Sequence, residues 1–310
     1  LVRRLLENGA NTSFVNRIAD KSLAIDDLIE NPTQTILSSA KRENIVGQKH
    51  LSIPLPAELY GQLRANSKGL DLANDSALAQ LNQTAQQFAK HQWSAAPMGE
   101  HFQTNDAVAP QSIINPARHS DVVGYVQEAT TEQVEQALNN AQAVQDIWAR
   151  TAKDTRASYL LRAADLMEAR LEELMVLLCR ESGKTYANAI AEVREAVDFL
   201  RYYATQMIDL DANAEVEPLG TMLCISPWNF PLAIFTGQVA AALVAGNTVI
   251  AKPAEQTPLI AAQAIQILWQ AGVPQAAVQL MPGRGETVGA QLSAAEQVQG
   301  IMFTGSTEVA

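Results

Sequence analysis

The chain has 310 residues, of which 47% are hydrophobic and 18% are charged, and its formal net charge is -11. This balance is typical of a globular protein and excludes a disordered chain. The acidity also disfavours a nucleic-acid partner, because phosphate binding requires clustered Lys and Arg. The two cysteines are few and far apart, as expected in a reducing cytoplasm. The four histidines show no spacing typical of metal ligands, so we expect no metal site.

The first 50 residues are polar, and their pattern predicts short helices. The segment LVRRLLENGAN predicts a helix that ends at Asn8-Gly9, and TSFVNRIAD predicts a second helix with Thr12 or Ser13 as its N-cap. Asn31-Pro32 breaks the chain before a third helix over about residues 33–40. Leu1 is not an initiator Met and the segment FTGSTEVA stops inside a strand-to-helix unit, so we expect the sequence to be part of a longer protein.

Residues 51–105 have the composition of a linker between catalytic domains. The segment SIPLPAELY contains two prolines, and a polar loop follows it. A helix is predicted over residues 75–92, and residues 95–104 are expected to be irregular. A connection of this length is expected between domains rather than inside one.

From residue 106 onward the pattern is α/β. Strands and helices alternate, which predicts a parallel, doubly wound sheet. The predicted strands are 122–128, 220–226, 247–252, 278–281 and 300–304. The predicted helices are 130–149, 154–181, 185–207, 231–245 and 257–271, with a short helix after Glu286 and another beyond Ser306. We expect the charged residues of helix 185–207, including Glu192 and Glu195, to form a charged face.

Asn229 lies in the loop after the strand 220–226. Ligands of such sheets bind beyond the carboxyl ends of the strands. A side-chain amide at this position could donate a hydrogen bond to a developing oxyanion, which is worth on the order of 3 kcal/mol of barrier. It could equally cap the helix that follows, and the residue type alone does not decide between these two roles.

The next strand ends at Lys252, and Glu255 follows three residues later. A Lys and a Glu at this edge could hold two neighbouring hydroxyls, as on an adenosine ribose, and an acidic residue there favours NAD because it repels a 2′-phosphate. The alternative is a solvated surface ion pair, which is the commoner environment of Lys and Glu.

Two glycine-containing turns complete the pattern. PGRGETVG, residues 282–289, has a GxGxxxG spacing through Gly283, Gly285 and Gly289, which on its own is a weak indication of a cofactor loop. FTGST adds Gly305, which allows close backbone approach, and Ser306 at a predicted helix start, where phosphate is attracted.

Taken together, PWNFP, KPAEQTP, the spaced glycines and FTGST closely resemble the NAD-binding half of the aldehyde dehydrogenase family over about residues 100–310. The resemblance implies that Asn229 helps to hold the thiohemiacetal oxyanion and that Lys252 and Glu255 bind the adenosine ribose. It also implies that Ser306 contacts the pyrophosphate and that Pro227 and Trp228 line the cofactor cleft. From the glycine turns, Gly283, Gly289 and Gly305 are further candidate cofactor residues.

The nucleophilic Cys and the general-base Glu of that family lie further downstream than residue 310. Cys179 is predicted to lie within a helix and Cys224 within a strand, so both are expected to be ordinary core residues. The 310 residues alone are therefore expected not to oxidise aldehydes.

The leading residues resemble the last barrel helix of proline dehydrogenase. Adjacent Arg3 and Arg4 point about 100° apart on a helix, and guanidinium suits a carboxylate because it donates two parallel bonds. An exposed charged helix is the alternative. With the resemblance, both arginines are implied to clamp the substrate carboxylate. A proline dehydrogenase segment before an aldehyde dehydrogenase is the order of the proline utilization A enzymes.

This resemblance implies three segments: the end of a proline dehydrogenase domain (1–50), a linker (51–105) and the amino-terminal part of an aldehyde dehydrogenase domain (106–310). The intact protein would oxidise L-proline with FAD, bound by an upstream barrel, and then glutamate semialdehyde to glutamate with NAD. The family also implies a homo-oligomer, a quinone or membrane electron acceptor, and a cytoplasmic location peripheral to the inner membrane. DNA is a partner only if an upstream module exists. The alternatives are a stand-alone aldehyde dehydrogenase for another aldehyde and a non-catalytic nucleotide-binding module.

Overall fold

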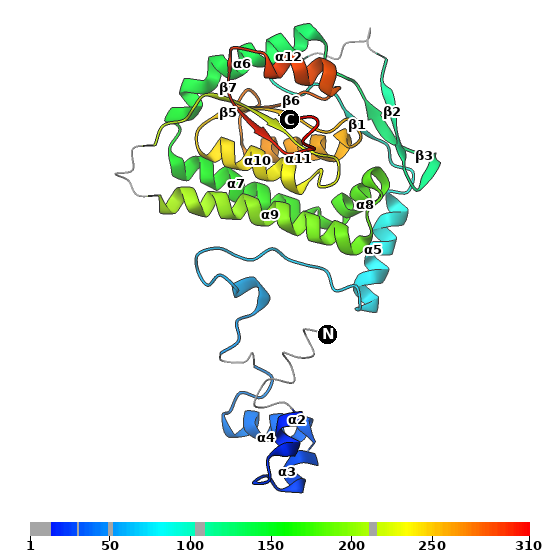
Figure 1. Ribbon diagram of the computed structural model, residues 1–310, viewed down its shortest axis with the longest axis vertical. Coiled ribbons are helices and arrows are strands. Elements are labelled where there is room, and N and C mark those ends of the chain that lie inside the picture. Colours follow the sequence, from blue (N-terminus) through cyan, green and yellow to red (C-terminus); the bar gives the residue numbers. More distant parts are fainter. Residues whose placement is uncertain (1–13, 30, 49–51, 103–108, 211–215) are drawn as a thin grey trace. The chain divides into compact units, whose positions relative to one another are not determined.

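The computed structural model describes residues 14–29, 31–48, 52–102, 109–210 and 216–310. Its chain divides into two compact units, Leu1–Pro56 and Ala57–Ala310 (Figure 1). Among the described residues, no helix is both long enough and apolar enough to cross a membrane.

The described part of the first unit is made of short helices. These are α2 (Phe14–Ala19), α3 (Ile25–Ile29) and α4 (Pro32–Arg42). The Asn31 side chain accepts a hydrogen bond from the Thr33 backbone N–H at 3.0 Å, and Pro32 occupies the first turn, so α4 begins where the Asn-Pro pair predicts. The helix predicted over residues 1–11, the proposed caps Thr12 and Ser13, and both Arg3 and Arg4 lie outside the described residues.

A four-stranded parallel sheet forms the centre of the second unit, as predicted. Its order is β6-β5-β4-β7. The strands are β4 (Thr221–Ile225), β5 (Thr248–Lys252), β6 (Val278–Leu280) and β7 (Val298–Phe303). The connecting elements are α10 (Ala233–Val244), α11 (Pro258–Ala271), the π-helical turn η2 (Gly285–Gly289) and α12 (Ala290–Ser293).

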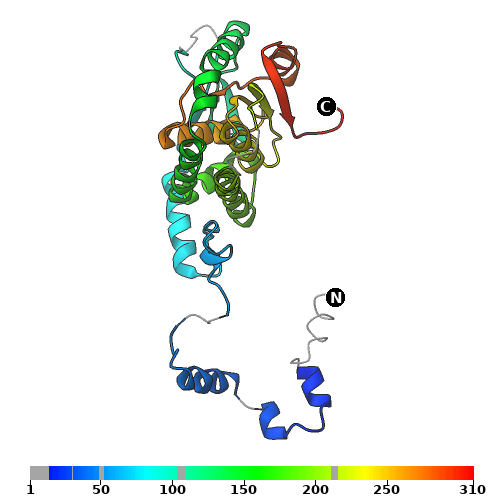
Figure 2. The ribbon, with the colours of Figure 1, turned by 90° about the vertical axis from the view of Figure 1, so that its left-hand side faces the viewer.

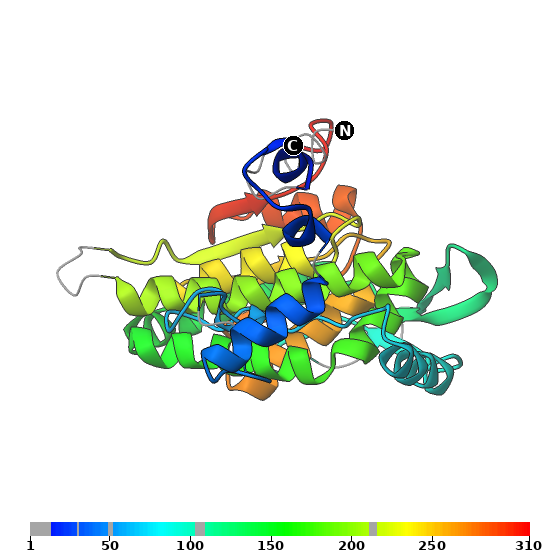
Figure 3. The same ribbon diagram turned by 90° about the horizontal axis from the view of Figure 1, so that it is seen from below.

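Helices cover both faces of this sheet. Alternate strand residues point to opposite faces. Leu223 and Ile250 therefore share one apolar cluster with residues of α6 (Thr131–Arg150) and α12, whereas Cys224 and Ala251 belong to the other, with α10 and α11. Figure 3 shows β4 and β7 side by side, with α10 on one side and α12 on the other. The predicted doubly wound class is thereby confirmed.

Three long helices form the outer layer: α7 (Lys153–Ala169), α8 (Leu171–Ser182) and α9 (Tyr186–Asp209). Helices α7 and α9 run alongside one another in Figure 1 and are seen nearly end-on in Figure 2. The single helix predicted over residues 154–181 is wrong, because the chain leaves helical geometry at Arg170. The Arg170 guanidinium binds Glu173 at 2.7 Å and Gln263 of α11 at 2.6 Å, so a tertiary contact overrides a locally helical sequence.

A second, smaller sheet was only partly predicted. It consists of β1 (Trp93–Ala95), β2 (Gln111–Asn115) and β3 (Arg118–Val126), in the order β1-β3-β2. Strand β1 is parallel to β3 and β2 is antiparallel to it. Only β3 overlaps a predicted strand. Gly124 allows β1 and β3 to approach, since a Cβ there would lie 2.1 Å from the Trp93 carbonyl oxygen.

The predicted linker differs from the structure because the second unit already begins at Ala57. Leu81, in α5 (Asp75–Gln87), is fully buried, and Trp93 is 4% exposed. The Ser67 hydroxyl donates to Asp198 of α9 at 2.7 Å. A few buried anchors in a polar, proline-containing stretch are therefore enough to attach most of the segment to the α/β unit. A 3-10 turn, η1 (Pro56–Glu58), precedes α5.

Candidate cofactor site at the carboxyl edge of the parallel sheet

Strand register brings the loops after β4, β5 and β7 to one edge of the sheet. Ile225 at the end of β4 pairs with Lys252 on β5 and with Phe303 on β7. The Ser226 N–H donates to the Lys252 carbonyl at 3.3 Å, and the Thr304 N–H donates to the Ile225 carbonyl at 3.1 Å. Three of the predicted site segments therefore emerge side by side.

Lys252 is an almost fully buried cation, with 4% of its surface exposed. Burial lowers the pKa of its ammonium, whereas the nearby carboxylates of Glu255, Glu128 and Glu286 oppose that shift. Within the described part of the chain its one hydrogen bond goes to the Pro253 carbonyl at 3.2 Å. An ammonium has three donors, so two remain for a ligand. A solvated surface ion pair, the alternative drawn from the sequence, is wrong for Lys252.

The glycine turn packs directly against this lysine. A Cβ at Gly289 would lie 3.3 Å from the Lys252 Cε, and a Cβ at Gly283 would lie 2.3 Å from a methyl group of Val288. The Glu255 carboxylate accepts a hydrogen bond from the Gly285 N–H at 3.0 Å, which leaves its second oxygen available. The glycines thus allow the turn to fold closely over Lys252 beside Glu255.

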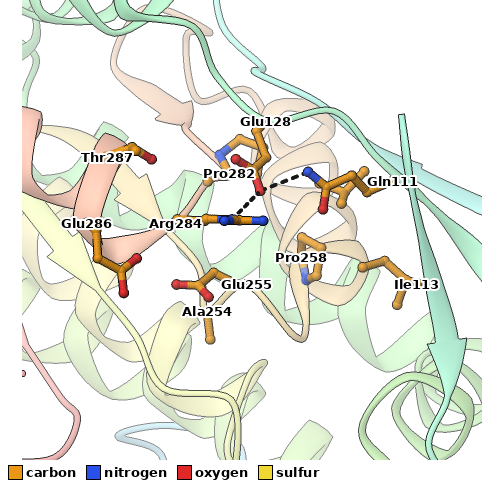
Figure 4. A pocket seen from close by; sticks show the side chains of 12 residues that line it. Gln111, Ile113, Glu128, Ala254, Glu255, Pro258, Pro282, Arg284, Glu286 and Thr287 are labelled. Carbon is orange, nitrogen blue, oxygen red and sulfur yellow. Dashed lines mark hydrogen bonds and ion pairs between the residues drawn. The ribbon is translucent and has the colours of Figure 1, made fainter. Parts of the chain in front are cut away.

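A pocket of about 500 Å³ opens beside this turn (Figure 4). Its volume is within the range of small-molecule sites. Glu255 and Gly283 are the two predicted site residues that line it. The remaining lining residues are Gln111, Ile113, Val126, Glu128, Ala254, Pro258, Pro282, Arg284, Glu286 and Thr287.

Some of these lining residues could not be found from local sequence signals. Glu128 lies 3.7 Å from Arg284 as an ion pair and accepts from Gln111 at 3.2 Å (Figure 4). Gln111 is the first residue of β2, and Glu128 lies in the segment that follows β3. This segment is joined to the glycine turn by a hydrogen bond from the Ala129 N–H to the Pro282 carbonyl at 2.8 Å. Arg284, by contrast, lies within the glycine turn and could have been included.

Asn229 lies in the loop between β4 and α10 and is exposed. Helix α10 has Leu232 as its N-cap residue, without a side-chain cap, so the alternative role of Asn229 as a helix cap is wrong. Trp228 is 58% exposed and Pro227 is partly buried. These three residues lie at the same sheet edge as Lys252 but do not line the 500 Å³ pocket.

Gly305 and Ser306 follow β7 and are exposed. Neither lines the pocket. The chain turns after Ser306, where a helix start is predicted, and the Val309 N–H donates to the Ser306 carbonyl at 3.2 Å.

Glu192 of α9 is fully buried, so its assignment to a charged surface is wrong. Its carboxylate accepts from the backbone N–H groups of Leu232 and Ala233, at 2.8 and 3.3 Å, and pairs with the Lys184 ammonium at 2.8 Å. Glu192 follows buried Ala189 by three residues, within the apolar stripe of α9, and this spacing is the signal that sequence reasoning missed.

The two cysteines are not poised for attack. Burial raises the pKa of the Cys224 thiol to about 12 and that of the Cys179 thiol to about 11. Both thiols are therefore protonated near neutral pH, as expected of core residues.

Comparison with known proteins shows the family of the chain. Residues 102–310 match the model of the aldehyde dehydrogenase family. The chain belongs to the aldehyde dehydrogenase family. The resemblance carried by PWNFP, KPAEQTP and the glycine turns is thus confirmed over almost the range expected.

Relatives within this family include bifunctional proteins. The chain is 59% identical over all 310 residues to the bifunctional protein PutA of Escherichia coli strain K12, of which it covers 23%. It is similar to the structure of proline utilization A from Bdellovibrio bacteriovorus inactivated by N-propargylglycine, with a TM-score of 0.78 and 31% identity over 99% of this chain and 32% of that one. It also resembles a Thermus 1-pyrroline-5-carboxylate dehydrogenase with bound NAD, with a TM-score of 0.75 and 32% identity over 84% of this chain and 51% of that one.

The chain thus spans about a quarter of the length of the bifunctional relatives that it matches throughout. The predicted similarity to proline utilization A enzymes is confirmed at the level of sequence and fold.

Proposed function

We propose that the protein carrying this chain is an NAD-dependent aldehyde dehydrogenase that oxidises L-glutamate γ-semialdehyde to L-glutamate. The observation that carries the proposal is the buried Lys252 ammonium, which has free donors beside Glu255 and the glycine turn. The proline utilization A and 1-pyrroline-5-carboxylate dehydrogenase relatives support the choice of substrate.

The residues at the sheet edge fit NAD. The Lys252 ammonium can donate to a ribose hydroxyl, and the free oxygen of Glu255 can accept from its neighbour. The carboxylates of Glu255, Glu128 and Glu286 disfavour a 2′-phosphate by charge repulsion. Gly305 and Ser306, after β7, would face the pyrophosphate, with Pro227 and Trp228 along the cleft. When bound, NAD supplies the hydride acceptor.

Asn229 would act on the aldehyde itself. Its side-chain amide is free to donate a hydrogen bond to the oxygen of the aldehyde as negative charge develops there. The nucleophilic Cys and general-base Glu that the family uses are expected downstream of residue 310. The 310 residues are therefore proposed to bind the cofactor without turning over aldehyde.

We assign the preceding step, FAD-dependent oxidation of L-proline, to the intact protein. It would supply pyrroline-5-carboxylate, whose hydrolysis gives the semialdehyde. Arg3 and Arg4 are proposed to hold the proline carboxylate at the edge of that first site.

The test is NAD reduction by the full-length protein, followed at 340 nm. Glutamate semialdehyde is expected to give a kcat/KM well above that of propanal or benzaldehyde. Equal turnover of all three would favour an aldehyde dehydrogenase for another substrate. Binding of NAD without turnover of any aldehyde would favour a nucleotide-binding module.

A further inference from the structure

An ion pair between Lys184, just before α9, and Glu192 of α9 holds the loop that carries Asn229. Lys184 and Glu192, the members of the pair, come from outside the loop and from outside the pocket-lining residues. Their side chains are 12% and 0% exposed, respectively. Such a buried pair needs good geometry and further hydrogen bonds to offset its desolvation.

The ammonium of Lys184 makes three contacts. It lies 2.8 Å from Glu192 Oε2 and 2.8 Å from the carbonyl oxygen of Asn229, to which it donates. It also lies 4.5 Å from the centroid of the Phe230 ring, within the range of a cation–π interaction. One cation therefore fixes both the backbone of Asn229 and the side chain of the next residue.

Glu192 fixes the far end of the same loop. Its Oε1 accepts from the Leu232 N–H and from the Ala233 N–H. These are unpaired donors at the start of α10, where a carboxylate is also favoured by the helix dipole. The loop between β4 and α10 is thus held at its middle by Lys184 and at its end by Glu192, although Trp228, Asn229 and Phe230 are exposed.

We propose that Lys184 and Glu192 are positioning residues that orient the Asn229 amide for the reaction. The inference rests on the proposed role of Asn229 as an oxyanion donor. Neither residue needs to touch the substrate in this role. A misplacement of about 1 Å at a catalytic donor can cost on the order of a hundredfold in rate.

The first test is amide hydrogen exchange of the 310-residue chain. In Lys184→Met, exchange at Phe230, Leu232 and Ala233 is expected to rise about tenfold, because a charge-assisted anchor is lost. Lys184→Arg should restore slow exchange, and Lys90→Met, at an exposed lysine, should leave it unchanged. Loop exchange in Lys184→Met equal to that of the parent chain would overturn the inference.

Because Lys184→Met leaves a buried carboxylate unpaired, Glu192→Gln and the double variant complete a mutant cycle. Glutamine keeps an acceptor oxygen for the α10 donors and removes the charge. Coupling between the two sites supports the shared anchor, whereas additive effects on loop exchange contradict it. If Lys184→Met does not fold, Glu192→Gln alone tests the anchor, and loop exchange in that variant equal to that of the parent chain would overturn the inference.

The second test separates this inference from the proposed function. In the full-length enzyme, Lys184→Met is expected to lower kcat about tenfold, to leave the KM for NAD unchanged, and to be rescued by Lys184→Arg. If Asn229→Ala lowers kcat but Lys184→Met does not, the positioning role fails and the oxyanion role stands. If Lys184→Met loosens the loop while Asn229→Ala keeps full kcat, the oxyanion role fails and the anchor remains.

Discussion

Some side chains at the sheet edge have hydrogen-bonding groups that are left for a ligand. Others already form their hydrogen bonds and ion pairs within the protein. Among the residues that the structure describes, Lys252 makes one hydrogen bond for its three donors, and the amide of Asn229 lies in an exposed loop. Glu192, in contrast, accepts from two backbone donors through Oε1 and forms an ion pair with Lys184 through Oε2. A hydrogen-bond donor that is buried or enclosed without a partner costs free energy unless a ligand accepts from it. Residues with such donors are therefore assigned to ligand binding, and residues whose bonds are made within the protein are assigned to support of the site.

Replacing Asn229 with Ala in the full-length enzyme is expected to lower kcat by about a hundredfold, the usual effect of removing one oxyanion donor. Because the side chain caps no helix, the melting temperature should stay the same. Steady-state kinetics with glutamate semialdehyde and a thermal melt provide the measurements. An unchanged kcat would remove the oxyanion role.

Lys252→Met is expected to weaken NAD binding by the 310-residue chain about tenfold or more, because charge-assisted hydrogen bonds to the ribose are lost. The melting temperature should hold or rise, since an incompletely paired buried cation is replaced by an apolar side chain of similar length. Titration calorimetry measures the affinity, with Lys90→Met as the control. Undiminished NAD affinity would place the ribose elsewhere.

At the scale of helices and strands, the sequence pattern predicts the alternating strands and helices of the fold. It does not predict the places where a contact between distant residues changes the local structure. The strands and helices from β4 to β7 follow strong apolar patterns and were found. The break at Arg170 was missed because its cause is a contact with Gln263, far along the chain. Strands β1 and β2 were missed because neither has a continuous apolar run: β1 has an exposed residue between two buried ones, and β2 has only one buried residue.

The same reasoning explains the site. Lys252, Glu255, Gly283 and Gly289 were predictable because each sits at a strand end or in a turn whose chemistry is local. Glu128 joins them only through the smaller sheet, so no local pattern identifies it.

The first turn of α11 is capped by a buried carboxyl group, that of Glu181, and this cap gives a further prediction. Glu181 of α8 accepts from the Leu259 and Ile260 N–H groups at 2.7 and 2.9 Å. Despite these bonds, burial raises the pKa of Glu181 from 4.5 to about 8. The folded state therefore holds this proton more tightly than the unfolded state, so the stabilisation is complete below the unfolded pKa and is lost as pH rises through the folded pKa.

Glu181→Gln, which stays neutral and retains an acceptor oxygen, should remove this pH dependence. The free energy of unfolding of the parent chain is expected to fall relative to that of the variant as pH rises from about 5 to about 8. Urea unfolding at a series of pH values provides the comparison. Parallel profiles would mean that Glu181 is ionised in the folded chain throughout.

On the scale of the whole chain, composition and compactness divide the molecule at different residues. Composition predicted a linker up to residue 105, yet compactness places the boundary at Pro56. No residue of α4 is buried, whereas Leu81 and Trp93 lie in the core of the second unit. Residues 57–102 therefore contribute buried side chains to the core of the α/β unit, although their sequence is polar.

Two truncations distinguish the boundaries. Removal of residues 1–56 is expected to leave the melting temperature and NAD affinity of the remaining chain unchanged, because that cut leaves every core side chain of the second unit in place. Removal of residues 1–96 deletes Leu81, Trp93 and the parallel partner of β3. Each large buried side chain contributes on the order of 3 kcal/mol, a large fraction of the 5–15 kcal/mol or so that stabilises a typical domain, so this shorter chain should not fold cooperatively. Circular dichroism melts of both truncations, with NAD titration of whichever folds, measure the difference. A cooperative melt of the shorter chain at the parent temperature would restore the linker that composition predicted.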